Sequence, residues 1–377
     1  MGPYTEMRPV DFSFLYQRPR SPLGVSARRA RRLSRERRRR VLMTAEPSSF
    51  FTRRIIVVTG KGGTGKTTVS ATLGLAAAHH GLSTLLVEVG AFEQLPRLIT
   101  GRAEEPVGYR GRLLQPGIQA IRIEPFAALA EYLGLQIGSR RLVAQALRNR
   151  SLRQLLRGAP GWRELITLGK IWQLEQMEGP NGNPLYDLII VDAPATGHGL
   201  TFLDIPHVAR SAVQSGPLAR NARRVEELIR DPKRTQILPV SLAEELPAQE
   251  TGELVQRLRH DLGLVPDQVI VNAVAPPLPC PDPAELEQSL RRLPGDLPLT
   301  QLPQPESLAD AVAHTSARHR LNQAYLIEIA ERTGLPLVVL PLLDHGVNGP
   351  VELEALRPAL IESGQGPGIV PPREPAS

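Results

Sequence analysis

The stretch from Ile55 to Thr68 constrains the fold of this chain more than any other part of the sequence. Four β-branched apolar residues, 55–58, lead into a glycine-rich loop, and an apolar helical pattern follows it. Residues 60–67 fit the pattern G-x-x-x-x-G-K-[ST]. A loop of this kind points backbone N–H groups and the positive end of a helix dipole at an oligophosphate. The sequence therefore predicts a phosphate-binding loop inside a parallel βαβ unit.

The residue types in this loop fit nucleotide chemistry. Lys66 is expected to reach the β- and γ-phosphates, and the Thr67 hydroxyl is expected to bind Mg²⁺. The residues expected to surround the phosphates are Gly60, Lys61, Gly62, Gly63, Thr64, Gly65, Lys66, Thr67 and Thr68.

A second apolar strand is predicted at residues 187–192, and it ends in Asp192. Doubly wound sheets bind ligands at the carboxyl ends of their strands, so Asp192 is expected to hold Mg²⁺ through water. For Asp192 taken alone, a strand-end cap is the alternative. His198, in the loop that follows, fits either a phosphate sensor or a structural hydrogen bond.

Alternating strand and helix patterns predict an α/β fold, a doubly wound and mostly parallel sheet with an inserted helical subdomain. The nucleotide-binding domain is expected at residues 51–348, with helical inserts near 125–180 and 200–232. Residues 94–120 are predicted to be rich in loops. Residues 349–377 form a C-terminal segment whose Gly- and Pro-rich end is predicted to be disordered. The expected strands are 54–59, 84–89, 118–123, 187–192, 236–240, 268–274 and 335–340.

The basic character of the chain comes from its first residues. Twelve arginines against three acidic residues give residues 1–42 a net charge of +9, which exceeds the +7 of the whole chain. Residues 1–50 are predicted to be a disordered leader. The arginine run could bind nucleic acid or anionic lipid. Alternatively, translation starts at Met43, and the leader belongs to an over-extended start.

Cysteine content and hydropathy restrict the classes of protein further. Cys280 is the single cysteine, which excludes an internal disulfide and any multi-cysteine metal site. No run of eighteen apolar residues occurs, so no transmembrane segment is predicted. These observations are consistent with a cytoplasmic protein.

The loop has a second lysine, Lys61, and reads G-K-G-G-T-G-K-T-T. This resembles the deviant P-loop ATPases, and residues 192–198 resemble the switch II of the family of the arsenical pump-driving ATPase and the tail-anchored-protein targeting ATPase. The resemblance covers roughly residues 54–345. It implies a homodimer with ATP and Mg²⁺ at its seam, in which Lys61 reaches the partner's nucleotide. It also implies that Glu250 contacts the nucleotide region across the dimer and that Asn272 hydrogen-bonds adenine.

The chain departs from this family in two respects. Gly90 stands where the family has an Asp that positions the attacking water, and the residues alone do not show whether Glu88 or Glu93 substitutes for it. A lone Cys280 cannot supply the zinc pair of the targeting ATPase or the metalloid-binding cysteines of the pump ATPase. Arsenite is therefore not predicted as a ligand.

Three functions remain open from the sequence. The first is a homodimeric Mg-dependent ATP hydrolase, with Lys61, Lys66 and Asp192 as catalytic residues. It would couple ATP binding and hydrolysis to binding or delivery of a protein or membrane-protein partner, either free in the cytoplasm or peripheral to the membrane. The second is a nucleotide-binding regulatory switch with little hydrolysis, suggested by Gly90. The third, a partition-type ATPase that binds DNA through the leader, is disfavoured because the rest of the chain is nearly neutral.

Overall fold

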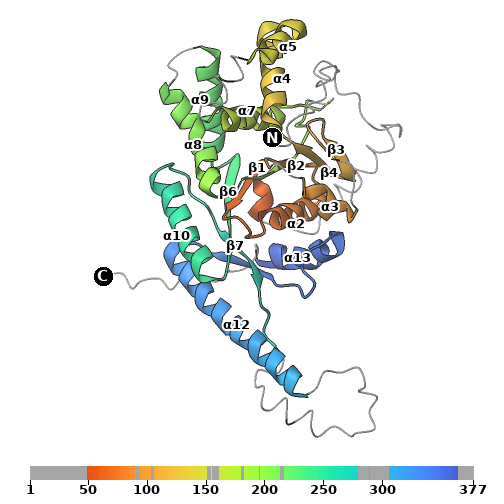
Figure 1. The fold of residues 1–377 in the computed structure, drawn as a ribbon, viewed down its shortest axis with the longest axis vertical. Helices are drawn as coiled ribbons and strands as arrows, with labels where there is room; N and C mark the ends of the chain where they lie inside the picture. Colours follow the sequence, from red (N-terminus) through yellow and green to blue (C-terminus); the bar gives the residue numbers. More distant parts are fainter. Residues whose placement is uncertain are drawn as a thin grey trace.

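The computed structural model describes residues 49–90, 93–102, 106–150, 154, 161–179, 182–194, 196–212, 216–278, 288 and 305–363. These residues form an eight-stranded sheet in the order β3-β4-β2-β5-β1-β6-β7-β8 (Figure 1). All neighbouring strands are parallel except β3 and β4. The predicted mostly parallel sheet is therefore confirmed. The strands are β1 (Ile55–Gly60), β2 (Thr84–Glu88), β3 (Arg112–Gln115), β4 (Ile118–Arg122), β5 (Leu188–Asp192), β6 (Thr235–Leu242), β7 (Val269–Val274) and β8 (Leu337–Pro341).

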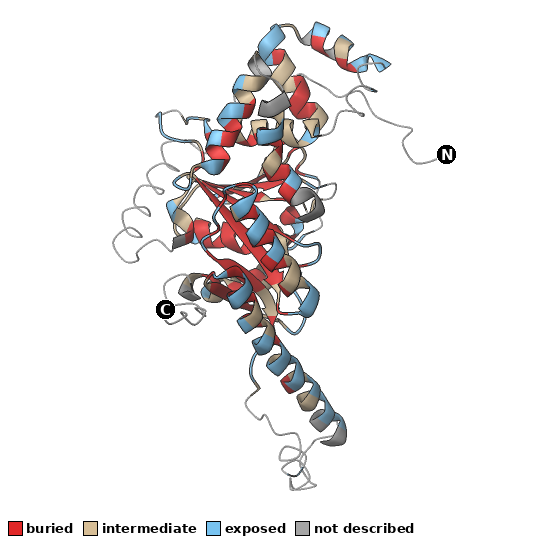
Figure 2. Ribbon diagram, turned by 90° about the vertical axis from the view of Figure 1, so that its left-hand side faces the viewer, coloured by how far each residue is buried: buried red, intermediate tan, exposed pale blue. Residues whose placement is uncertain are grey.

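Helices cover both faces of the sheet. One face carries α2 (Lys66–His79), α3 (Leu95–Thr100) and α13 (Pro350–Ser363), whose apolar residues share a core with alternate residues of the strands. The other face carries α7 (Trp162–Glu175), α8 (Thr196–Ala212), α9 (Pro217–Arg230), α10 (Glu245–His260) and α12 (Pro305–Thr333). Side chains alternate between the two cores because successive strand residues point to opposite faces. The centre of the sheet is thus lined by apolar residues on both sides, and Figure 2 shows it as buried.

The helical insert stands above the sheet in Figure 1. It contains α4 (Pro125–Ile137) and α5 (Arg140–Arg148), which share a small core of their own with Trp162 and Ile166 of α7. Trp162 meets the ring of Phe126 edge-on at 5.0 Å, so it is a packing residue of this core.

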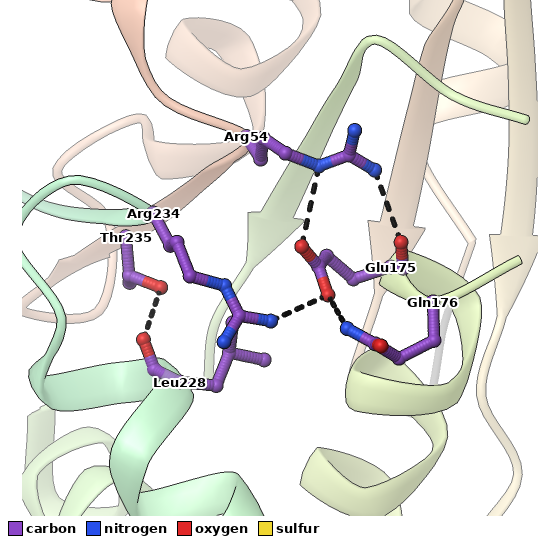
Figure 3. A network of polar contacts seen from close by, with 6 residues as sticks. All are labelled: Arg54, Glu175, Gln176, Leu228, Arg234 and Thr235. Carbon is purple, nitrogen blue, oxygen red and sulfur yellow. Dashed lines mark hydrogen bonds and ion pairs between the residues drawn. The ribbon is translucent and has the colours of Figure 1, made fainter. Parts of the chain in front are cut away.

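A buried acid connects the insert to the sheet (Figure 3). Glu175, at the end of α7, lies between Arg54, which precedes β1, and Arg234, which precedes β6. Its carboxylate is 3.2 Å from Arg54 Nε and 2.7 Å from an Arg234 terminal nitrogen. The buried Glu175 carboxylate therefore connects the amino ends of β1 and β6 with the last turn of α7.

The structure corrects several details of the prediction. Residues 94–120, predicted to be rich in loops, include α3 and the antiparallel strand β3. Both elements are short, so neither produces a periodic pattern long enough to be recognised. The segment after residue 348 begins with α13, whose Leu353, Leu356 and Leu360 are buried in the core shared with α2. The leader, Cys280 and the tail after residue 363 lie outside the described residues.

No helix among the described residues combines the length and apolarity needed to cross a lipid bilayer.

Candidate nucleotide-binding site

The loop between β1 and α2 has the backbone shape of a phosphate cradle. Gly60 and Gly65 adopt φ values of +148° and +88°, which favour glycine. A Cβ at Gly60 would lie 2.3 Å from the carbonyl oxygen of Val240, and one at Gly65 would lie 2.1 Å from Asn272 Nδ2. Both glycines are therefore required by close packing as well as by backbone conformation.

The side chains of the loop are directed at its own backbone. Lys66 Nζ donates to the carbonyl oxygen of Lys61 at 2.8 Å, and the Thr64 hydroxyl donates to the same oxygen at 3.0 Å. Burial lowers the pKa of Lys66, and the nearby Asp192 opposes that shift. The ammonium is thus held inside the loop, where phosphate oxygens would offer it better partners.

Asp192, at the carboxyl end of β5, lies under the first turn of α2. The Thr67 hydroxyl donates to its Oδ2 at 2.7 Å, while its buried Oδ1 has no hydrogen-bond partner among the described residues. Burial raises the Asp192 pKa to about 6, against the opposing effects of the Thr67 hydrogen bond and the Lys66 charge. A hydroxyl and a half-satisfied carboxylate are suitable oxygen donors for hydrated Mg²⁺, so the residues present fit the predicted metal.

A second acid lies beside Asp192. Glu88 ends β2 and is directly paired with Asp192 across the parallel strands. Both follow, by two residues, side chains in the core shared with α2 (Leu86 and Ile190), so both carboxylates lie on the same face of the sheet. Glu88 is 4% exposed, and its Oε1 accepts the backbone N–H groups of Gln94 and Leu95 at 2.7 and 3.1 Å.

The position of Glu88 raises its pKa to about 7. Burial is the largest cause, and the negative charges of Asp192 and Glu93 add to it, whereas the two backbone hydrogen bonds oppose it. Two neighbouring carboxylates at the mouth of a phosphate cradle repel each other unless a cation or proton lies nearby.

Glu93, the other acid considered as a substitute for the missing Asp, points elsewhere. Its carboxylate accepts the backbone N–H groups of Val107 and Gly108 and is 3.0 Å from Arg122 Nε. The Glu93 carboxylate therefore connects the loop before β3 with β4. Gly90 follows β2 by two residues, and the next two positions lie outside the described residues.

Lys61 and Glu250, which the resemblance assigned to contacts across a dimer, meet within this one chain. Lys61 Nζ donates to Glu250 Oε1, and the two side chains are 51% and 31% exposed. The neighbouring Thr251 is buried and donates to the Ser241 hydroxyl at 2.9 Å, so it supports the packing of α10 on β6.

Asn272 on β7 also contacts the loop. Its Nδ2 donates to the carbonyl oxygen of Thr64 at 3.1 Å. The amide group therefore supports the phosphate loop directly, and the predicted bond to adenine stays a prediction.

The structure brings the predicted residues together from five separate elements. The loop joins the end of β1 to the start of α2, Asp192 ends β5, Asn272 lies near the end of β7, and Glu250 lies in the second turn of α10. The side chain of His198 lies outside the described residues. Sequence reasoning named Glu88 but could not place it. An apolar strand ending in an acid, the signal that identified Asp192, was also present there.

Comparison with known proteins agrees with this site. The family described as anion-transporting ATPase matches residues 53–218. ATPase BagA of Mycobacterium tuberculosis is 33% identical over 238 residues, 61% of this chain and 68% of the relative. ATPase get3 of Pyrenophora tritici-repentis is 24% identical over 362 residues, 85% of this chain and 94% of the relative. The arsenical pump-driving ATPase of Acidiphilium multivorum is 26% identical over 255 residues, 63% of this chain and 41% of the relative.

Proposed function

The chain belongs to the anion-transporting ATPase family, and from this premise we propose that it is a magnesium-dependent ATP hydrolase that couples its nucleotide state to a partner. The observation that carries the proposal is the pair formed by Thr67 and Asp192 at 2.7 Å under the phosphate loop. Asp192 Oδ1 is left without a partner among the described residues, at the place where a hydrated cation would lie.

Each residue then has a distinct task. The backbone N–H groups of residues 60–67 and the Lys66 ammonium bind the phosphate oxygens, and Lys66 exchanges the Lys61 carbonyl for them. Thr67 and Asp192 orient the metal and its water molecules. Mg²⁺, when bound, neutralises charge on the β- and γ-phosphates. Catalysis of this kind is mainly positioning and electrostatic stabilisation, so a rigid cradle is the main requirement.

We propose that the active unit is a homodimer in the cytoplasm, in which Lys61 of each protomer reaches the nucleotide of the other. The contact between Lys61 and Glu250 within one chain supports a role for Glu250 in holding this lysine until a partner arrives. Glu250 Oε2 is buried without a hydrogen-bond partner among the described residues, so the carboxylate retains capacity for a second donor.

The partner is proposed to be a protein client or a membrane protein, bound through the helical insert. Between α4, α7 and α9 the insert has a cavity of about 180 Å³, lined by Leu165, Ile166, Trp172 and Val225 among others. A metalloid is not proposed as cargo, because Cys280 is the only cysteine of the sequence.

Three lysine variants test this function. Lys66→Ala is expected to abolish steady-state ATP hydrolysis, and Lys61→Ala is expected to impair hydrolysis together with nucleotide-dependent dimerisation. Lys233→Ala, an exposed lysine before β6, is the matched control and should behave as wild type. Unchanged hydrolysis and dimerisation in both loop variants would refute the proposal.

Gly90 supports a second candidate function, a nucleotide-binding switch that hydrolyses ATP very slowly. Glu88 argues for hydrolysis, because it places a carboxylate next to Asp192 despite the loss of the Asp at position 90. We propose that Glu88 orients water of the metal shell and fixes the segment after β2 through Gln94 and Leu95.

Single-turnover hydrolysis separates the two functions. Glu88→Gln retains an oxygen acceptor for both backbone N–H groups but removes the charge. If Glu88 acts through its charge, this variant loses single-turnover rate and binds a non-hydrolysable ATP analogue with a weaker dependence on Mg²⁺ concentration. A wild-type rate no greater than that of buffer, together with a large increase in Gly90→Asp, would favour the switch.

A further inference from the structure

The sequence of the helical insert has a concentration of positive charge that the nucleotide site does not use. Residues 132–163 contain seven arginines and no lysine, aspartate or glutamate. Outside the leader and this segment the chain carries a net charge of −9, so this excess is local. It requires an explanation separate from the phosphate chemistry at the sheet.

At the corner between α4 and α5, large apolar side chains face solvent beside these arginines. Leu135, Ile137 and Leu142 are 63%, 48% and 57% exposed. The corner is a tight turn at Gly138, which has φ +71°. The inner residues of α5, Val143 and Leu147, pack into the core of the insert, so the opposite side of α5 is directed outward.

Three arginines of this region whose side chains the structure describes have no acidic partner among the described residues. Arg141, Arg148 and Arg150 are exposed, and none of them forms an ion pair with a residue that the structure describes. Elsewhere, exposed arginines such as Arg257 and Arg332 pair with an acid one helical turn away. Leu135 also borders the cavity between α4, α7 and α9 and is left out of this surface. Ile137, Arg141, Leu142 and Arg148 are called the tip surface below.

We propose that the tip surface binds the anionic headgroups of a phospholipid membrane, with its two aliphatic side chains, Ile137 and Leu142, entering the interface. Unpaired arginines attract an anionic leaflet, and adjacent large apolar side chains gain free energy by partial insertion. A nucleic acid would be matched by the arginines alone and would leave the aliphatic side chains in water. The insert lies at the opposite end of the molecule from the outer part of α12 in both views, so the sheet does not obstruct it (Figures 1 and 2). This inference does not depend on ATP hydrolysis.

Co-sedimentation of the full chain with vesicles tests the charge. Binding should occur to vesicles of phosphatidylcholine with phosphatidylserine, weaken as salt is added, and be weak on phosphatidylcholine alone. The double variant Arg141→Glu/Arg148→Glu should lower the partition coefficient at least about thirtyfold, from about a fivefold contribution per arginine near an anionic surface. The control Arg318→Glu/Arg320→Glu, on exposed positions of α12, changes the net charge equally and should bind nearly as wild type. The leader is present in every variant and contributes equally.

Fluorescence tests insertion at the tip itself, without interference from the leader. Leu142→Trp should gain a blue-shifted emission that brominated lipids quench in anionic vesicles. Leu321→Trp, at a position on α12 that is 53% exposed, should not. Equal behaviour of tip and control variants in both experiments overturns the proposal. Retention of duplex RNA or DNA that only the tip variant loses, without vesicle binding, would assign the surface to nucleic acid and would also overturn it.

Discussion

The buried acids at the two opposite edges of the same sheet have contrasting surroundings. At the amino edge, Glu175 is enclosed by two arginines and meets all of its obvious hydrogen-bonding needs. At the carboxyl edge, Asp192 and Glu88 are paired across β5 and β2, and the Lys66 charge acts against the raised pKa of Asp192. The first arrangement stabilises the fold, whereas the second is costly until a ligand brings positive charge. The difference indicates which edge is built for packing and which for binding.

The largest expected effect is on catalysis, at the carboxyl edge. Asp192→Asn retains an acceptor for the Thr67 hydroxyl but removes the charge that orients the metal. We expect the turnover number to fall by about 100- to 1,000-fold. The metal-free variant should be at least as stable as wild type at pH 8, because a buried charge has been removed. If Asp192→Asn lowered the free energy of unfolding as well as the activity, Asp192 would be a residue that stabilises the fold, as Glu175 is.

The amino edge should respond in the opposite way. Glu175→Ala leaves two arginines without their shared partner, and the free energy of unfolding should fall by about 2–4 kcal/mol. Urea denaturation gives this value, and the activity per folded molecule below the midpoint should be normal. Glu175→Gln is the control, since it keeps the hydrogen bonds, and its effect should be smaller.

The pH dependence of stability should sharpen the contrast. Because the folded-state pKa of Glu88 is raised from 4.5 to about 7, its favourable contribution is complete below pH 4.5 and is lost as the pH rises through 7. The metal-free wild type should therefore lose on the order of 2–3 kcal/mol relative to Glu88→Gln across this interval. Denaturation of both proteins from pH 5 to pH 8 measures the difference. Parallel curves would show that Glu88 titrates normally.

The smallest effect is expected at the exposed ion pair of the site. Glu250→Gln should change the free energy of unfolding by less than about 0.5 kcal/mol, because Lys61 and Glu250 are both partly exposed. Thermal unfolding with and without added salt checks this value. A decrease in the free energy of unfolding as large as that of Glu175→Ala would contradict the contrast between an amino edge that stabilises the fold and a carboxyl edge that binds a ligand.

The sequence predicted the parts of the site that come from long regular segments. β1, the glycine loop and α2 form one continuous signal, and Asp192 ends a run of apolar residues, so both were located to within a residue or two. The position of Glu88 beside Asp192 depends on strand order, which puts β2 next to β5 although 103 residues lie between Glu88 and Asp192 in the sequence. The pairing of Lys61 with Glu250 depends likewise on the placement of α10. No local pattern encodes such neighbours.

The strand order also affects how the chain is made. β1 lies between β5 and β6, so the central strand has no hydrogen-bonding neighbour until residues beyond 188 have been synthesised. At about 5–20 residues per second, roughly 6 to 26 seconds pass between the synthesis of β1 and that of β5. The future central strand of the nascent chain therefore has no strand partner during that interval.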